Sequence, residues 1–250
     1  MTSCSLSGLC ALVSLVALTG CNGSSSASSS NPSLPTSARV RFVDGAPSLE
    51  ALINGAPQDI GAAYLQAGGE TVASTFQYGA MTAFLAVNAG TLSLVARDTL
   101  GYQVGPLKSS PLAGGKQYTL VVVGVYPHYR VLTFDEPSAG GAAISLYEAS
   151  TTVANAGFGR FRASTHSQFQ TLGNAAFGTV TTASLGKSVS DVGGYVGPAN
   201  APIGTQTPSQ IDGFDARNVL PFYNSARLSL FLFDAKPSSG LGPVFGSLDR

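Results

Sequence analysis

Residues 118–123 read Tyr118-Thr119-Leu120-Val121-Val122-Val123, a short run that is almost continuously apolar or β-branched. Such a run is typical of a strand that is covered on both faces or lies in the centre of a sandwich. The preceding Gly114 is expected at a turn. This stretch therefore predicts a buried strand.

Alternation of apolar and polar residues predicts further strands nearby. They are expected at 38–43, 49–53, 84–87, 92–97 and 131–134. In the first of them, Val40 and Phe42 share one face, while Arg39 and Arg41 share the other. The pair Asn54-Gly55 is a strong hairpin signal. Because no stretch shows convincing helical periodicity, we expect an all-β protein whose first unit is an immunoglobulin-like sandwich.

The same pattern repeats more weakly after a turn-rich junction. Asp135-Glu136 is expected to end the last strand of the first unit in water, and 138–141 reads as a linker. Strands are then expected at 144–147, 160–162 and 228–233, and Phe177-Gly178-Thr179-Val180 resembles Tyr78-Gly79-Ala80-Met81. The residues from Gly193 to Gly213 are expected to form a long loop, either functional or a simple insertion.

Two alignments of the second half on the first remain open. The preferred one matches 228–233, then Asp234 and Pro237, to 131–134, then Asp135 and Pro137. The other matches Leu228-Ser229-Leu230 to Leu92-Ser93-Leu94, which would leave the second domain without its last strands. The preferred alignment predicts two tandem sandwiches, at 38–137 and 142–237, followed by a tail at 238–250.

The N-terminus carries a localisation signal. Leu18-Thr19-Gly20-Cys21 follows an apolar run that is too short to span a bilayer, which needs about 20 apolar residues. These residues resemble a bacterial lipobox, which implies that 1–20 are a signal peptide and that Cys21 is lipidated. The Ser-rich residues 21–37 are expected to be a flexible tether. An ordinary secretory signal is the alternative, and Asn22 after the cysteine implies the outer membrane where the cell has one.

Composition excludes several function classes. Charged residues make up only 10% of the chain and the formal net charge is zero, so we expect no nucleic-acid partner and no polybasic membrane contact. Cys4 and Cys10 fall in the expected signal peptide, so Cys21 would be the sole cysteine of the mature chain. No intrachain disulfide and no cysteine metal site are therefore expected.

Catalytic chemistry is sparse in this sequence. The histidines are His128 and His166, and no nucleophile elbow, phosphate loop or His-Glu-x-x-His motif is present. Tyr126, His128, Tyr129 and Arg130 form an expected hairpin tip that could grip a sugar or a partner protein, or simply pack over the sandwich end. His166 is expected in solvent, and Asp212 with Asp215 is too sparse an acidic pair for a calcium site. We expect no cofactor and no metal.

The first unit resembles a known family. The motifs are 38–43 with Pro47, then Ile53-Asn54-Gly55, Tyr78-Gly79, 87–91 and 113–122. They resemble the domain-of-unknown-function family numbered 4397, over residues 38–136 and only loosely beyond. The resemblance implies exported or lipid-anchored bacterial proteins built of tandem β-sandwiches, and it brings no catalytic residues.

These observations lead to one main expectation and two alternatives. The main one is a lipid-anchored cell-envelope protein that serves as a non-catalytic interaction or structural module, with specificity from the tips at 126–130 and 193–215. One alternative is a carbohydrate-binding module, which requires a coplanar set of exposed tyrosines. The other is a hydrolase, which the missing constellations disfavour. The expected partners are the membrane, through the anchor, and an envelope protein or glycan.

Overall fold

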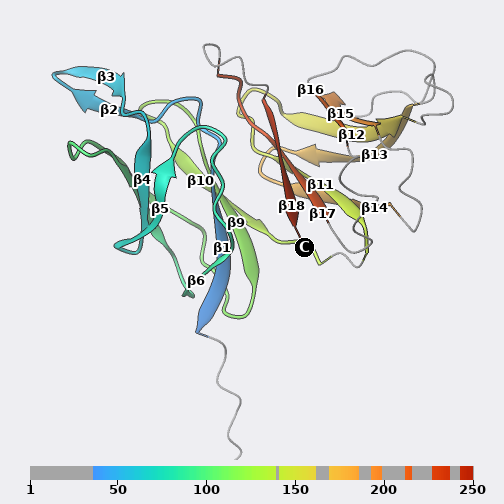
Figure 1. Cartoon of the computed structure of the whole chain (residues 1–250), viewed down its shortest axis with the longest axis horizontal. Coiled ribbons are helices and arrows are strands. Elements are labelled where there is room, and N and C mark those ends of the chain that lie inside the picture. Colours follow the sequence, from blue (N-terminus) through green and yellow to red (C-terminus); the bar gives the residue numbers. More distant parts are fainter. Residues whose placement is uncertain are drawn as a thin grey trace, which may run out of the picture. The chain divides into compact units, whose positions relative to one another are not determined.

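The structure is a computed structural model in which residues 36–138, 141–161, 169–185, 193–198, 212–215, 227–236 and 243–249 are described. Residues 34–250 form one compact unit. Its described residues form strands and no helix, which confirms the all-β fold (Figure 1). The strands up to residue 138 are β1 (Ser37–Asp44), β2 (Glu50–Ile53), β3 (Ala56–Asp59), β4 (Ala63–Ala67), β5 (Glu70–Phe76), β6 (Leu85–Asn88), β7 (Ser93–Arg97), β8 (Gln103–Lys108), β9 (Gln117–Val123) and β10 (Arg130–Asp135). The later strands are β11 (Ala143–Glu148), β12 (Asn155–Phe161), β13 (Phe169–Ala176), β14 (Val180–Ser184), β15 (Gly193–Pro198), β16 (Asp212–Asp215), β17 (Arg227–Leu232) and β18 (Val244–Asp249).

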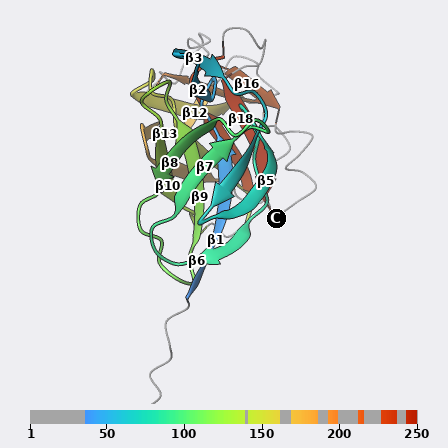
Figure 2. The ribbon, with the colours of Figure 1, turned by 90° about the vertical axis from the view of Figure 1, so that its left-hand side faces the viewer.

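The first half is a two-sheet sandwich with an added hairpin. One sheet has the order β10-β9-β1-β6 and the other β5-β4-β7-β8 (Figure 2). Alternate residues of β1 and β9, such as Val40 and Leu120, pack against Leu65 and Leu94 of the second sheet and form a buried core. The β2–β3 hairpin turns through Asn54 and Gly55, whose φ angles of 52° and 83° confirm the predicted turn.

The second half repeats this strand plan without the hairpin. Its sheets have the orders β14-β11-β17-β18 and β13-β12-β15-β16. In each half the first strand pairs in parallel with the penultimate one, β1 with β9 and β11 with β17. The core between the second pair of sheets is built from residues such as Ile144, Leu230 and Phe158. Two tandem sandwiches are therefore present, and their immunoglobulin-like subtype stays a prediction.

The repeat also corrects the sequence alignment. The segment 228–233 corresponds to β9, and not to 131–134 or to 92–94, because β17 takes the place of β9 beside the first strand. The predicted tail contains β18, which occupies the place of β10. Both alignments were wrong because they matched an apolar run to a half-exposed strand, whereas β17, like β9, is covered on both faces. The predicted loop 193–213 was also wrong in part, since 193–198 and 212–215 pair as β15 and β16.

The sheet β10-β9-β1-β6 of the first sandwich and the sheet β14-β11-β17-β18 of the second pack on each other through their outer faces. We call these two the central sheets. Val43, Val121 and Phe134 of the first half form one buried cluster with Tyr147 and Phe231 of the second. The rings of Phe134 and Tyr147 meet edge to face at a centroid distance of 5.4 Å, and Tyr147 stacks on Phe231 at 4.5 Å. This contact explains why 118–123 reads as a continuous apolar run: one face of β9 lines the first core and the other meets the second sandwich.

Four charges meet in the same interface, of which Arg41 and Glu136 are buried and Arg227 and Asp249 are partly buried. The Arg41 guanidinium, 2% exposed, donates to Asp249 at 2.6 Å and to Glu136 at 3.2 Å. Arg227 pairs with the other oxygen of Glu136 and, at 3.1 Å, with Asp249. Tyr147 adds a hydroxyl bond of 2.8 Å to Glu136. Burial opposes ionisation of Asp249, but the charge of Arg41 and hydrogen bonds from Ser229 and Arg227 lower its pKa. The charges thus compensate one another where water is excluded.

This cluster overturns one expectation about the end of β10. Glu136 was expected to end its strand in water, but its side chain is 3% exposed. The alternation of β1 is confirmed, yet the polar face that carries Arg41 is covered by the second sandwich. Only Asp135 behaves as expected, because it is exposed and pairs with Lys116 at 3.6 Å. The sequence pattern around Glu136 could not show its burial, because the residues Tyr147 and Arg227 that cover it belong to the second sandwich.

Candidate functional site

Several connections gather at one end of the first sandwich. Because β1 and β9 are parallel, the chain leaves Asp44 and Val123 at the same edge of their sheet. The β2–β3 hairpin follows the first of these residues and the 124–129 turn follows the second. The 98–102 turn belongs to this end too, since Arg97 pairs with Tyr64 at the start of β4. We name residues 45–62, 98–102 and 124–129 the loop end. The chain enters β1 at Ser37, at the opposite end (Figure 1).

The second sandwich contributes to the loop end. The Tyr78 hydroxyl donates to the Asp234 carbonyl at 2.8 Å, and Lys236 pairs with Asp59 at 3.7 Å. The Arg130 guanidinium lies 4.7 Å from the ring centroid of Phe177. These contacts set the turn between β13 and β14 and the residues after β17 beside the tip of the first sandwich.

The predicted tip is a tight turn between β9 and β10. The amide of His128 donates to the Val125 carbonyl at 2.6 Å and closes the turn. Gly124 has a φ of 102°, and a Cβ there would lie 2.4 Å from the His128 carbonyl oxygen. Only glycine fits this conformation without strain. The hairpin tip predicted at 126–130 is thus confirmed as a turn.

The four predicted tip residues have different surroundings. Tyr129 is a structural anchor: its hydroxyl accepts from the Glu50 amide at 2.7 Å and donates to the Ser48 carbonyl at 3.0 Å. Burial raises the pKa of Tyr129 to about 12. Tyr126 is half-buried, whereas His128 and Arg130 are exposed. The tip therefore offers an imidazole and a guanidinium, while Tyr129 holds it against β2.

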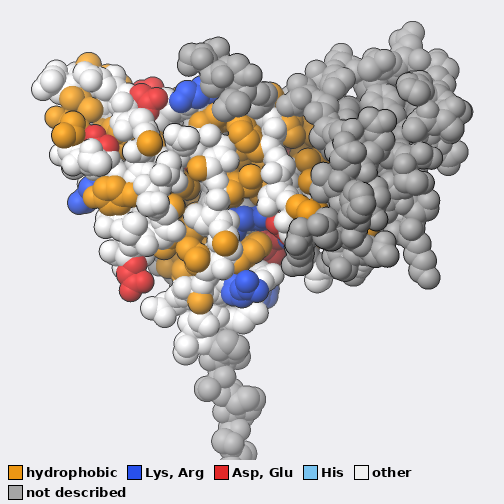
Figure 3. Space-filling model, viewed as in Figure 1, with side chains coloured by type: hydrophobic (Ala, Val, Ile, Leu, Met, Phe, Trp, Pro, Cys, Tyr) orange, Lys and Arg blue, Asp and Glu red, His pale blue; other side chains and the backbone are white. Residues whose placement is uncertain are grey.

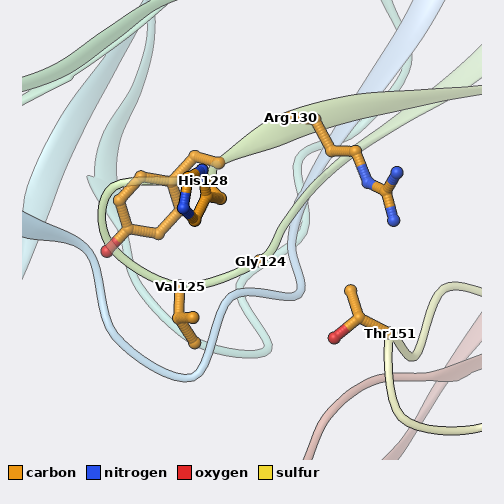
Figure 4. Close-up of a pocket in the computed structure, with 6 residues that line it drawn as sticks. Gly124, Val125, His128, Arg130 and Thr151 are labelled. Atoms are coloured by element: carbon orange, nitrogen blue, oxygen red, sulfur yellow. The ribbon is translucent and has the colours of Figure 1, made fainter.

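A pocket of about 480 Å³ lies beside this tip (Figure 4). Its lining residues are Gly124, Val125, His128, Tyr129, Arg130 and Thr151. Arg130 and Thr151 face one another from opposite sides of the opening, with the Gly124 backbone between them and the tip. Thr151 and Phe177 were missed by sequence reasoning, because nothing in residues so distant from 124–130 signals that they meet it. The one local signal that could have been used is the hydroxyl run Ser150-Thr151-Thr152, since such residues favour turns.

The carboxylate of Asp234 holds the turn that carries Thr151 on one side of the pocket. Thr151 donates its hydroxyl proton to Asp234, as do Ser150 at 2.6 Å and Thr152 at 3.0 Å. The Thr152 amide adds a bond of 3.0 Å. Burial alone would raise the pKa of Asp234, but these hydrogen bonds lower it. Asp234 therefore keeps its charge while holding the turn that carries Thr151.

Two further acids occupy equivalent places in the two sandwiches. Asp44 ends β1 and Glu148 ends β11, and both are fully buried. One oxygen of each accepts the amide two residues later, from Ala46 at 3.0 Å and from Ser150 at 2.9 Å. Among the described residues the other oxygen has no hydrogen-bond partner. Burial raises the pKa of Asp44 to about 7 and that of Glu148 to about 8.

Other predicted sites lie outside what the structure describes. Cys21 and His166 are not among the described residues, nor are the side chains of Asp212 and Asp215. Within the described ranges, no group of three or more His, Cys, Asp or Glu side chains is placed to hold a metal ion. No helix among those residues is long and apolar enough to cross a membrane.

Both acidic and basic side chains lie on the surface around the loop end (Figure 3). The exposed large hydrophobic side chains of the described chain are Leu52, Leu100, Tyr102 and Val125. All four belong to connections of the loop end or to the strands that border them, so apolar exposure is concentrated there. No family model matches the chain, and no curated protein matches it. The resemblance to family 4397 therefore stays a prediction.

Proposed function

We propose that the protein is a lipid-anchored component of the cell envelope, a non-catalytic module that binds a partner with its loop end. The anchor is the lipobox-like Cys21, followed by a Ser-rich tether. Membership in family 4397 is part of this proposal, as is an outer-membrane location.

The observation that carries the proposal is the position of the tip pocket relative to Ser37. The tether leads into Ser37, and β1 then runs to Asp44, so about 23 Å of strand separates the tether end from the loop end. The loop end carries the exposed Val125 and His128, and the exposed Arg130 follows at the start of β10. A tethered protein of this plan would present these groups away from its point of attachment.

The test is site-specific photo-crosslinking in cells. One variant carries the photoreactive residue at Val125, which is 53% exposed. The matched control carries it at Lys116, whose side chain is 60% exposed at the other end of β9. Capture of a defined protein or glycan from Val125 and not from Lys116 is expected. Equal capture from both positions, or none from either, would contradict a binding role for the loop end.

The anchor has its own test. Cys21→Ser is expected to abolish incorporation of a labelled fatty acid and to release the protein in soluble form. Labelling that persists in this variant would refute acylation at Cys21, whatever the loop end binds.

The alternative function, carbohydrate binding, would use charge and hydrogen bonds and not stacking on tyrosines. It requires a platform of exposed tyrosines, and among the described tyrosine side chains Tyr102 alone is classed as exposed, while Tyr78, Tyr118 and Tyr147 are buried. Stacking on a tyrosine platform is therefore not favoured by the described surface. Recognition of a glycan by charge and hydrogen bonds is favoured by the exposed His128 and Arg130.

A further inference from the structure

The tip pocket has room for more than a single small ion. Its volume is about 480 Å³. Ligand pockets in proteins typically measure about 300–1,000 Å³, so this volume suits a small organic ligand. Its lining combines the apolar Val125 with the polar side chains of His128, Arg130 and Thr151. A ligand of one or two sugar rings would match this size and this mixture of surfaces.

The tip side of the pocket favours an anionic group. The Arg130 guanidinium is positioned over the Phe177 ring, and no carboxylate among the described residues pairs with it. Its N–H donors are therefore free to bind a carboxylate in the planar, two-bond geometry that arginine favours. None of the six lining residues is acidic, and His128 lines the pocket on the far side from the guanidinium (Figure 4).

The opposite side of the pocket favours a hydroxyl donor. Thr151 gives its hydroxyl proton to Asp234, so its oxygen can only accept a hydrogen bond from a ligand. The Asp234 carboxylate is already bonded by donors from Ser150, Thr151 and Thr152. A simple carboxylate has no hydroxyl group to offer Thr151, whereas a sugar has several.

We infer that the pocket binds an acidic sugar unit, with its carboxylate on Arg130 and a ring hydroxyl donating to Thr151. The inference rests on the proposed function, because it names the ligand class of the same loop end. Uronic acid units of a polysaccharide carry both required groups on one ring, which distinguishes them from neutral sugars and from the terminal carboxylate of a peptide.

The test is calorimetric titration of the full chain in detergent micelles. The probe is a hexuronate trisaccharide, and its matched control is the same trisaccharide with each carboxylate reduced to a hydroxymethyl group. Acetate and a tripeptide with a free carboxyl terminus separate a bare carboxylate from a sugar acid. We expect the uronate to bind and each of the other probes to bind at least about tenfold more weakly, as loss of a charge-assisted hydrogen bond implies.

Two arginine variants assign the contact. Arg130→Gln is expected to weaken uronate binding at least about tenfold. Arg39→Gln is the control, because Arg39 is also exposed and lies 5.7 Å from the Phe84 ring centroid, but at the tether end of β1. This control should bind the uronate as tightly as the unaltered chain does.

Several outcomes would overturn the inference. They are equal binding of the reduced trisaccharide, equally tight binding of acetate or the tripeptide, an equal loss in the Arg39 variant, and no binding by any probe. If Val125 captures a protein while the uronate does not bind, this inference fails and the proposed function stands. If Val125 captures nothing and no probe binds, both fail.

Discussion

The two sandwiches follow one strand plan but meet each other with different side chains. At equivalent places in the central sheets, Arg41 of β1 corresponds to Ser145 of β11, and Val43 corresponds to Tyr147. The acids Glu136 and Asp249 also occupy equivalent places. Glu136 follows β10, and its amide donates to the Gln117 carbonyl at the start of β9. Asp249 ends β18 and pairs with Arg227 at the start of β17. Each sandwich thus supplies one acid, while the arginines come from different strands. A repeated backbone can therefore build a joint whose charges compensate one another both within each half and between the halves.

The largest expected effect tests this difference in the buried charges. Arg41→Met removes a cation that compensates Glu136 and Asp249, so we expect a loss of about 3–5 kcal/mol in the free energy of unfolding. Ser145→Ala, at the equivalent place, removes a hydroxyl that bonds Thr182 at 2.7 Å and should cost about 1 kcal/mol. Urea unfolding measures both. If the two variants lose similar free energy, the charge cluster does not dominate the joint.

The next effect compares two equivalent turn glycines. Gly79 and Gly178 have φ angles of 80° and 77°, and their amides donate to the Asp44 and Glu148 carbonyls. A Cβ at Gly79 would lie 2.2 Å from the Phe245 ring of the second sandwich, while one at Gly178 would meet nothing within 4 Å. Gly79→Ala should therefore cost about 3 kcal/mol, from strain and overpacking together.

Gly178→Ala serves as the control for backbone strain alone. It should cost about 1 kcal/mol in the same urea titration. Equal costs at the two positions would mean that Phe245 moves aside and that the joint is not closely packed at Gly79.

The third effect concerns the pH dependence of stability. The pKa of Asp44 is raised from 3.8 to about 7 and that of Glu148 from 4.5 to about 8, so the folded state binds more protons than the unfolded state between these values. Their stabilisation is fully present below about pH 4 and is lost as the pH rises through 7 and 8. Asp234 and Asp249 have lowered pKa values, so their contribution is lost only as the pH falls below about 4.

We therefore expect the free energy of unfolding to be greatest near pH 4 and to fall by at least about 2 kcal/mol by pH 8. Thermal or urea unfolding across this range measures it. Asp44→Asn should remove the part of the slope that ends near pH 7, and Glu148→Gln the part that ends near pH 8. A flat profile in the unaltered chain would show that these acids titrate alike in both states.

The smallest effect compares the aromatic residues before the two turn glycines. Tyr78→Phe removes the buried bond to the Asp234 carbonyl and should cost about 1 kcal/mol. Phe177→Leu removes the ring beneath Arg130 and should cost about 0.5 kcal/mol. Unfolding experiments on single and double variants would check this order, and a larger cost at Phe177 would reverse it.

Sequence patterns were most informative where a strand serves one sandwich. The alternation in 38–43 and 92–97, the Asn54-Gly55 turn and the correspondence of Tyr78-Gly79 with Phe177-Gly178 are all confirmed. Patterns were less informative in β15, whose Gly-rich sequence has little strand propensity. That strand is held by pairing with β12 and β16, which its own residues do not reveal.

Some features of the candidate site could be predicted from the sequence and others could not. The tip at 126–130 and its exposed His128 and Arg130 could be predicted, because a turn between two strong strands lies at the surface. The anchoring of Tyr129 by Ser48 and Glu50 could not, nor could the part that Thr151 plays in the pocket. These contacts depend on which turns the parallel pairs bring to the same edge.

The sequence by itself determined that the chain is all-β, repeated and poor in charge, because alternation, turn residues and composition act locally. Tertiary structure alone decided the rest: that Arg41 and Glu136 are buried rather than solvated, that 228–233 takes the place of 118–123, and that Arg130 faces Thr151. The physical reason is that burial and pairing are properties of two surfaces in contact. A residue's own neighbours in the chain specify only one of them.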